Sequence, residues 1–403
     1  MVRWHYGFYP TTLLEHAIAA TLIAFAVETI RAGRPLPTKW GGPGWGWGIP
    51  VALFVVAGAL DVVFAPSRTA ALGLYRAYII EPIAFAFVLV NVLTTARRAL
   101  AVLAGLGVAG IWVGAPNIVV VLQALREHTY NVTQTPPVVI YTTANALALF
   151  LGPLIAVAAA MLLHERDRNI RAGAAVFLIV AAPAMLLTFS RGGFLAMAVV
   201  AVGLALSHPR RWWLLVGVAV AGALIGAIPP VFHRITLEFQ NVEGSTFIGR
   251  DGRIELWKAA LTMLRANPIF GAGLSGYAEK VAPYWNADHS DALFIDPHNI
   301  VLNFWSETGL LGLISFAWIM VKGFRTTWRG WHETWPAWKP IELGILLALV
   351  AMVVHGLVDV PYFKNDLSLE FWALIAIAVA GLLYGGLKSA PLKEREMAEP
   401  APV

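Results

Sequence analysis

The chain has 403 residues, of which 58% are hydrophobic and only 13% are charged. Soluble domains carry about 25% charged residues, so this composition excludes an ordinary water-soluble protein. The absence of cysteine excludes disulfides, thiolate nucleophiles and cysteine-ligated metals. In a polytopic membrane protein, a net charge of +5 indicates basic cytoplasmic loops rather than a nucleic-acid partner.

Apolar runs of membrane-spanning length follow one another along the chain. A membrane helix needs about 20 apolar residues, and the pattern predicts eleven spans, with a twelfth element in 40–48 as an alternative. The predicted spans are 11–30, 49–64, 77–95, 99–122, 142–163, 172–189, 191–206, 212–230, 299–321, 341–358 and 368–386. We therefore predict an all-α polytopic membrane protein with about 11–12 transmembrane helices.

The positions of lysine and arginine predict the orientation. With the N-terminus outside, the inner segments carry 17 of the 29 basic residues, and six of the rest lie in one long loop, where the positive-inside rule acts weakly. The predicted organisation is N-terminal membrane helices over 1–230, an extracytoplasmic loop over 231–298, C-terminal membrane helices over 299–387 and a cytoplasmic tail over 388–403.

The apolar run 172–206 is too long for one membrane helix. Its 35 residues would extend about 52 Å as a straight helix, beyond a hydrocarbon core of roughly 30 Å. Only Ser190-Arg191-Gly192-Gly193 interrupts it, and glycine permits backbone angles that other residues avoid. We expect the chain to turn back there and to hold Arg191 at the outer membrane boundary.

The long loop is expected to contain an amphipathic helix over 253–266. Its apolar residues recur at helical spacing, namely Ile254, Trp257, Leu261 and Leu264. Asn267-Pro268 ends it, because the residue before proline avoids helical angles. Arg250 and Arg253 precede or begin this helix, where positive charge opposes the helix dipole, so both are candidates for binding an anion.

Other ionisable residues gather at the predicted outer ends of the spans, among them Glu15, His16, Asp61, Glu81 and Asp359. Ionisable groups in membrane segments are functional candidates, and this distribution favours a polar cavity that opens outward. His298 lies at the mouth of the span that begins at 299. A metal site at Asp288, Asp291 and Asp296 is an alternative, but the spacing fits no standard ligand pattern, and no metal is predicted.

Four motifs in this order resemble the O-antigen ligase/polymerase superfamily, over about 185–375. They are Thr188-Phe-Ser-Arg-Gly-Gly193, then Arg253–Leu261 with Asn267–Gly273, then His298–Gly312, and then His355–Asp366. The resemblance implies a GT-C-type membrane glycosyltransferase, inverting and independent of metals and cofactors, at the outer face of the inner (plasma) membrane. It implies a glycan on undecaprenyl pyrophosphate as donor and a sugar hydroxyl as acceptor, on the lipid A–core oligosaccharide in a ligase.

By motif match, the resemblance assigns the catalytic positions to Arg191, Arg253 and His298. We add substrate-binding candidates at Arg250, Tyr277, Asn299, Glu307, His355 and Asp359; Tyr277 is considered as a stacking face for a sugar. Arginine offers a planar fork to phosphate oxygens, which suits a pyrophosphate leaving group. His298, with an ordinary pKa near 6.5, is suited to act as the general base.

Three alternatives remain for the function. A polymerase would use another lipid-linked repeat unit as acceptor, and the sequence offers no residue that separates it from a ligase, which we favour. A lipid-linked glycan transporter would predict inverted repeats and polar residues near the membrane midplane, whereas the ionisable residues here lie at span ends. A membrane scaffold without chemistry is the third.

Overall fold

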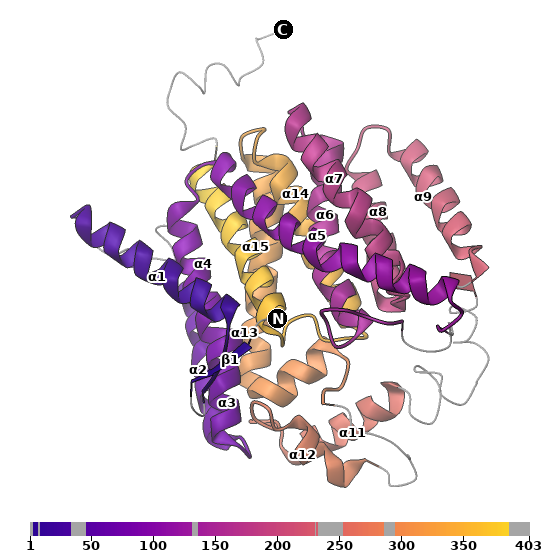
Figure 1. Ribbon diagram of the computed structural model, residues 1–403. Helices are drawn as coiled ribbons and strands as arrows, with labels where there is room; N and C mark the ends of the chain where they lie inside the picture. Colours follow the sequence, from indigo (N-terminus) through magenta and orange to yellow (C-terminus); the bar gives the residue numbers. More distant parts are fainter. Residues whose placement is uncertain are drawn as a thin grey trace.

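The computed structural model describes residues 3–6, 9–33, 46–130, 136–229, 231–232, 253–285 and 295–386. In this part of the chain it is an all-α polytopic membrane protein, as predicted (Figure 1). The described strands form one antiparallel hairpin, β1 (Arg3–Tyr6) with β2 (Tyr9–Thr12). The hairpin leads directly into the first helix.

The helices fall into two groups on either side of the long loop. The first group is α1 (Leu13–Arg31), α2 (Gly48–Phe64), α3 (Arg68–Tyr75), the π-helix η1 (Arg76–Ile80), α4 (Glu81–Val92), α5 (Ala96–Arg126), α6 (Ala144–His164), α7 (Arg168–Leu186), α8 (Arg191–Leu206) and α9 (Arg211–Gly226). The loop and C-terminal part contain α11 (Arg253–Ala266), α12 (Tyr277–Val281), the 3-10 helix η3 (Ala282–Tyr284), α13 (Ile300–Glu333), α14 (Lys339–Gly356) and α15 (Asn365–Tyr384).

Each of the eleven predicted spans coincides with an apolar helical segment. Eight segments of the described chain are long and apolar enough to cross a membrane, and α2, α8 and α9 are shorter apolar helices. The span predicted over 77–95 begins earlier, because α3, η1 and α4 form one continuous segment, Arg68–Val92. Most of the alternative element in 40–48 lies outside the described residues.

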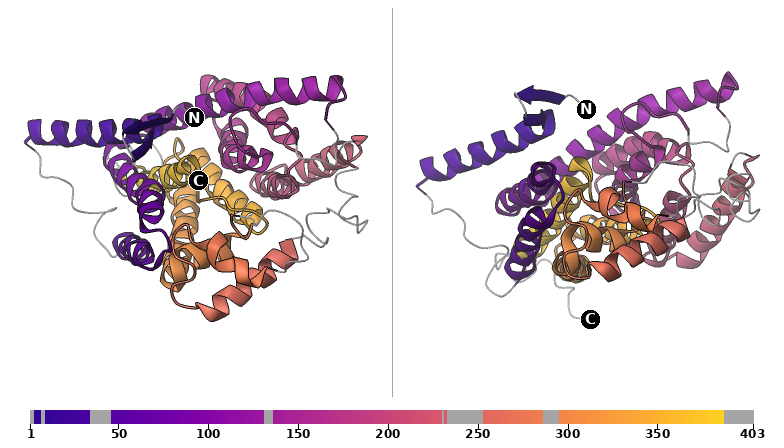
Figure 2. Two further views of the ribbon diagram at one scale, coloured as in Figure 1. Left: turned by 60° about the horizontal axis from the view of Figure 1, so that its bottom comes forward. Right: turned by 90° about the horizontal axis from the view of Figure 1, so that it is seen from below.

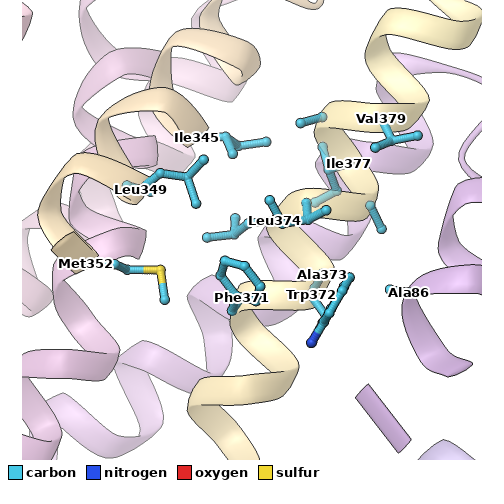
Figure 3. Packing of buried hydrophobic residues seen from close by; sticks show 14 of the residues in the cluster. Ala86, Ile345, Leu349, Met352, Phe371, Trp372, Ala373, Leu374, Ile377 and Val379 are labelled. Carbon is cyan, nitrogen blue, oxygen red and sulfur yellow. The ribbon is translucent and has the colours of Figure 1, made fainter. Parts of the chain in front are cut away.

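The centre of the bundle is formed by α6, α14 and α15, which are far more buried than α1 or α7. Figure 3 shows Phe371, Leu374 and Ile377 of α15 facing Leu349 and other apolar side chains of α14. In both views of Figure 2, α1 and the long α5 lie along one side of the molecule, and α11 and α13 lie toward the other.

Helix α13 is broken at Thr308–Gly309, and the break receives a segment of the loop. Gly309 has φ +59°, and a Cβ there would lie 2.5 Å from the Ile269 carbonyl oxygen. The Leu310 amide donates to this oxygen at 2.8 Å, and the Ala272 amide donates to the Ser306 carbonyl at 2.7 Å. The loop is thus joined to a membrane helix through backbone hydrogen bonds that an unbroken helix could not offer.

The predicted loop helix is present as α11, but its buried face differs from the predicted stripe. Ile254 and Leu261 are 40% and 39% exposed. Leu264 of the predicted stripe is buried, and the other buried side chains are Leu256, Ala259, Ala260 and Met263. Two alanines on this face let the helix approach its neighbours closely. The prediction considered only large apolar residues, so it did not identify this face as buried.

Candidate functional site

A cavity of about 670 Å³ lies where the loop meets the ends of the membrane helices. Its lining comes from the start of α8, the start of α11, the segment before α13, the first turns of α13, the end of α14 and the segment before α15. Six predicted site residues line it: Arg191, Arg253, His298, Glu307, His355 and Asp359. Residues from four separate motifs thus meet in one place.

The turn between α7 and α8 positions Arg191. The apolar run ends one helix at Leu186 and begins the next at Arg191, so the predicted break is confirmed. Ser190 caps α8, and its Oγ accepts from the Gly193 amide at 3.3 Å. A Cβ on Gly192 would lie 2.7 Å from the His355 ring, so only glycine lets α8 begin this close to α14. Arg191 consequently enters the cavity as the first residue of α8.

Arg253 is the first residue of α11, as the sequence predicted, and lines the cavity beside two carboxylates. Its Nε atom is buried and makes no hydrogen bond within the described part of the chain. Burial lowers the pKa of Arg253, and the negative charges of Asp359 and Asp296 oppose that change. Because arginine remains protonated in proteins, the cavity contains a desolvated positive charge with hydrogen-bonding capacity in reserve.

His298 is held in a left-handed backbone conformation with φ +47°, which is uncommon for residues other than glycine. Its backbone amide donates to Asp296 Oδ1 at 2.9 Å. Its Nδ1 lies 3.1 Å from the same oxygen and 3.5 Å from Asp359 Oδ1. Strained backbone of this kind often marks functional positions. The two carboxylates favour a proton on Nδ1, which makes Nε2 the nitrogen able to accept another.

The electrostatics around His298 favour its charged form. Burial acts to lower the pKa of His298, but the contact with Asp359 and the charge of Asp296 act more strongly, and the pKa is raised. For Asp359, burial acts to raise the pKa, yet the contact with His298 and the nearby His355 outweigh it, and the pKa is lowered. These opposite changes favour an imidazole that is supported by an ionised carboxylate.

His355 and Glu307 join structural elements at the cavity wall. The His355 Nε2 atom lies 3.3 Å from Ser190 Oγ, which links the end of α14 to the start of α8. Glu307 Oε2 accepts from the Ser275 amide at 2.6 Å, and Ser275 has φ +62°. Phe189, Ser275 and His298, three of the described non-glycine residues with positive φ, all line this cavity.

Two predicted substrate-binding residues, Asn299 and Tyr277, do not line the cavity. Asn299 caps α13, accepting from the Val301 and Leu302 amides, and its Nδ2 donates to the Leu357 carbonyl at 2.9 Å. Tyr277 is 1% exposed and packs within the loop core, which does not fit stacking against a sugar. Arg250 lies outside the described residues.

The alternative metal site gains no support in the described part of the chain. Within 253–285, 295–386 and the other described ranges, no group of three His, Asp or Glu residues is arranged to hold a metal ion. Asp288 and Asp291 lie outside those ranges. Asp296 lies inside them, and its carboxylate contacts His298.

The cavity is also lined by polar residues that were not among the predicted site residues. They include Ser275, Asn303 and Lys364. Asn303 is an amide in an otherwise apolar stretch of helix, four residues after the cap of α13. Lys364 stands at the N-cap of α15, where a cation opposes the helix dipole. Asn303 and Lys364 are both unfavourable residue types for their positions in a helix, and such unfavourable residues can indicate a functional site in the sequence.

Part of the chain is similar to proteins of one known family. Residues 174–317 match the family model described as O-antigen ligase, a range that includes Arg191, Arg253 and His298. The O-antigen ligase of Salmonella typhimurium is 30% identical over 148 residues, which cover 33% of this chain and 34% of that protein. The O-antigen ligase of Pseudomonas aeruginosa is 27% identical over 201 residues, covering 50% of this chain and 44% of that protein.

The matched segments span less than half the length of these two relatives. The family-model match includes the turn before α8, the loop helix and the start of α13, which contribute to the lining of the cavity. Over residues 174–317, the chain is therefore similar to the O-antigen ligase family.

Proposed function

We propose that the protein is an O-antigen ligase. It transfers a glycan from undecaprenyl pyrophosphate to a sugar hydroxyl of the lipid A–core oligosaccharide, at the outer face of the inner membrane. The observation that carries this proposal is the presence of Arg191, Arg253 and His298 in one cavity at the ends of membrane helices. A donor with a lipid tail can remain in the bilayer while its pyrophosphate and sugar reach such a cavity.

The two arginines bind the leaving group in this proposal. The bond between the anomeric carbon and the pyrophosphate oxygen breaks, and that oxygen gains negative charge. Arg191 and Arg253 balance the charge, and fixed positive groups aimed at developing negative charge are often the largest contribution to catalysis. The buried Nε of Arg253, which has no hydrogen-bond partner among the described residues, supports this role, because a phosphate oxygen would provide one.

His298 activates the acceptor. Its Nε2 takes the proton of the acceptor hydroxyl while the hydroxyl oxygen attacks the anomeric carbon from the side opposite the pyrophosphate. This single displacement inverts the anomeric centre and requires no covalent intermediate. Asp359 and Asp296 stabilise the imidazolium that forms, since both lie within 3.5 Å of Nδ1.

Transfer by the purified full-length protein tests the proposal and separates it from polymerisation. The protein in lipid nanodiscs is incubated with lipid-linked glycan, with or without the lipid A–core acceptor. A ligase forms product only when the core acceptor is present. A ladder of longer lipid-linked glycans without core acceptor would make the protein a polymerase. No transfer of any kind would refute both and favour a transporter or a scaffold.

A further inference from the structure

The cavity contains a buried amide that the proposed mechanism does not use. Asn303 is 1% exposed, lines the cavity from α13, and its Oδ1 makes no hydrogen bond with any described residue. A buried polar atom without a partner destabilises the folded protein, because its hydrogen bonds to water are lost and not replaced. An apolar residue would avoid this cost at a site on a membrane helix, so the amide calls for a partner that enters the cavity.

Asn303 lines the same cavity as His298. It lies on the first turns of α13, four residues before Glu307, and residues four apart on a helix share a face, so both side chains line the cavity from one side of α13. The rings of Tyr78 and Phe363 also line the cavity, with their centroids 6.2 Å apart in an edge-to-face contact. A cavity lined by an amide and by aromatic rings offers hydrogen bonds together with apolar surface, a combination that suits a sugar ring.

Chemical complementarity selects one part of the substrates. The polyprenyl tail has no hydrogen-bonding groups, and the ionised pyrophosphate has only acceptors, which leave an amide oxygen unpaired. A hydroxyl both donates and accepts, so neighbouring hydroxyls of a sugar can satisfy the oxygen and the NH₂ group of one amide. We propose that Asn303 binds hydroxyl groups of the sugar held beside His298, and thereby selects the sugar that reacts.

This inference rests on the proposed glycosyl transfer, and its test separates the two. The matched pair of variants is Asn303→Leu and Ser306→Ala in full-length protein in nanodiscs. Ser306 lies on the same helix, and its Oγ is also buried without a partner in the described structure, but it does not line the cavity. Each variant is assayed for melting temperature, for KM of donor and acceptor separately, and for inhibition by undecaprenyl pyrophosphate that carries no sugar.

For Asn303→Leu we expect a melting temperature equal to or above that of the wild type, because an unpaired amide is replaced by an apolar side chain of similar size. We expect KM to rise about tenfold or more for whichever substrate supplies the sugar. Inhibition by undecaprenyl pyrophosphate should remain unchanged. The donor and acceptor measurements then show which sugar Asn303 contacts, and Ser306→Ala should match the wild type in every transfer measurement.

Three results would overturn the inference. The first is wild-type KM values in Asn303→Leu. The second is an equal loss of affinity for sugar-free undecaprenyl pyrophosphate, which would place Asn303 at the anion. The third is a clear fall in melting temperature both in Asn303→Leu and in Asn303→Ala, which would make the amide a structural group. If the wild type transfers no glycan, the proposed function fails and this inference fails with it.

Discussion

Asp359→Asn is expected to move the acid side of the pH–rate profile to lower pH. The base must be unprotonated to accept a proton, so the rate rises as pH passes through the pKa of His298. That pKa is raised by Asp359 and Asp296 against the effect of burial. Asparagine keeps the oxygen that accepts from the Val360 amide, so the substitution removes the charge and preserves the local fold.

The size of the shift follows from the 3.5 Å between His298 Nδ1 and Asp359 Oδ1. Two unit charges at this distance interact by about 1 kcal/mol in water and by about 4–5 kcal/mol at an effective dielectric constant of 20. One pKa unit corresponds to about 1.4 kcal/mol. Asp296 remains 3.1 Å from the same nitrogen and still supports the charged imidazole. We therefore expect an interaction energy near the lower of these two values, which moves the acid limb of the profile by about one pH unit.

Initial rates of glycan transfer, measured from acidic to mildly basic pH at saturating donor, provide the assay. The control is Glu255→Gln, which removes one negative charge from a residue that pairs with Lys258 and does not line the cavity. Its profile should coincide with that of the wild type. An acid limb that stays in place in Asp359→Asn would refute the assignment of His298 as a base supported by this carboxylate.

Further substitutions test other parts of the site. Arg253→Lys keeps a positive charge but loses the planar fork, so we expect transfer to fall by about tenfold or more, as measured by kcat. Gly192→Ala places a Cβ 2.7 Å from the His355 ring. We expect overpacking to lower the free energy of unfolding by about 1–3 kcal/mol and to reduce transfer. In the control Gly217→Ala, the new Cβ has no atom within 4 Å, so melting temperature and transfer should match the wild type. Asn299→Ala removes the cap of α13 and should lower the free energy of unfolding by about 1 kcal/mol, as measured by thermal unfolding. A large rise in KM without destabilisation would contradict the structural role of Asn299.

The fold was largely predictable from the sequence, because each apolar segment carries its own signal. Length and hydropathy located the spans, and the glycine pair after Arg191 marked the break between α7 and α8. The kink at Thr308–Gly309 was not predictable in this way. It exists because residues 269–272 donate and accept backbone hydrogen bonds there, and hydropathy carries no information about which distant segment supplies them.

The site was predictable as a set of residue types but not as a geometry. The motifs identified Arg191, Arg253 and His298. The two carboxylates beside His298 are far apart in the sequence, because Asp296 precedes α13 and Asp359 follows α14. The position of Tyr277 was not predictable either. The sequence does not distinguish an aromatic loop residue that faces a ligand from one that packs inside the loop, as Tyr277 does. Asn303 was overlooked because its significance depends on its oxygen having no partner among the residues that the structure describes.

The most direct test of the account is single-turnover glycan transfer by His298→Ala with donor already bound. Removing a general base reduces the rate by about a hundredfold to ten-thousandfold, whereas binding of undecaprenyl pyrophosphate to Arg191 and Arg253 should be retained. We predict normal binding of undecaprenyl pyrophosphate together with this loss of transfer. Transfer by His298→Ala at the wild-type rate would contradict the account.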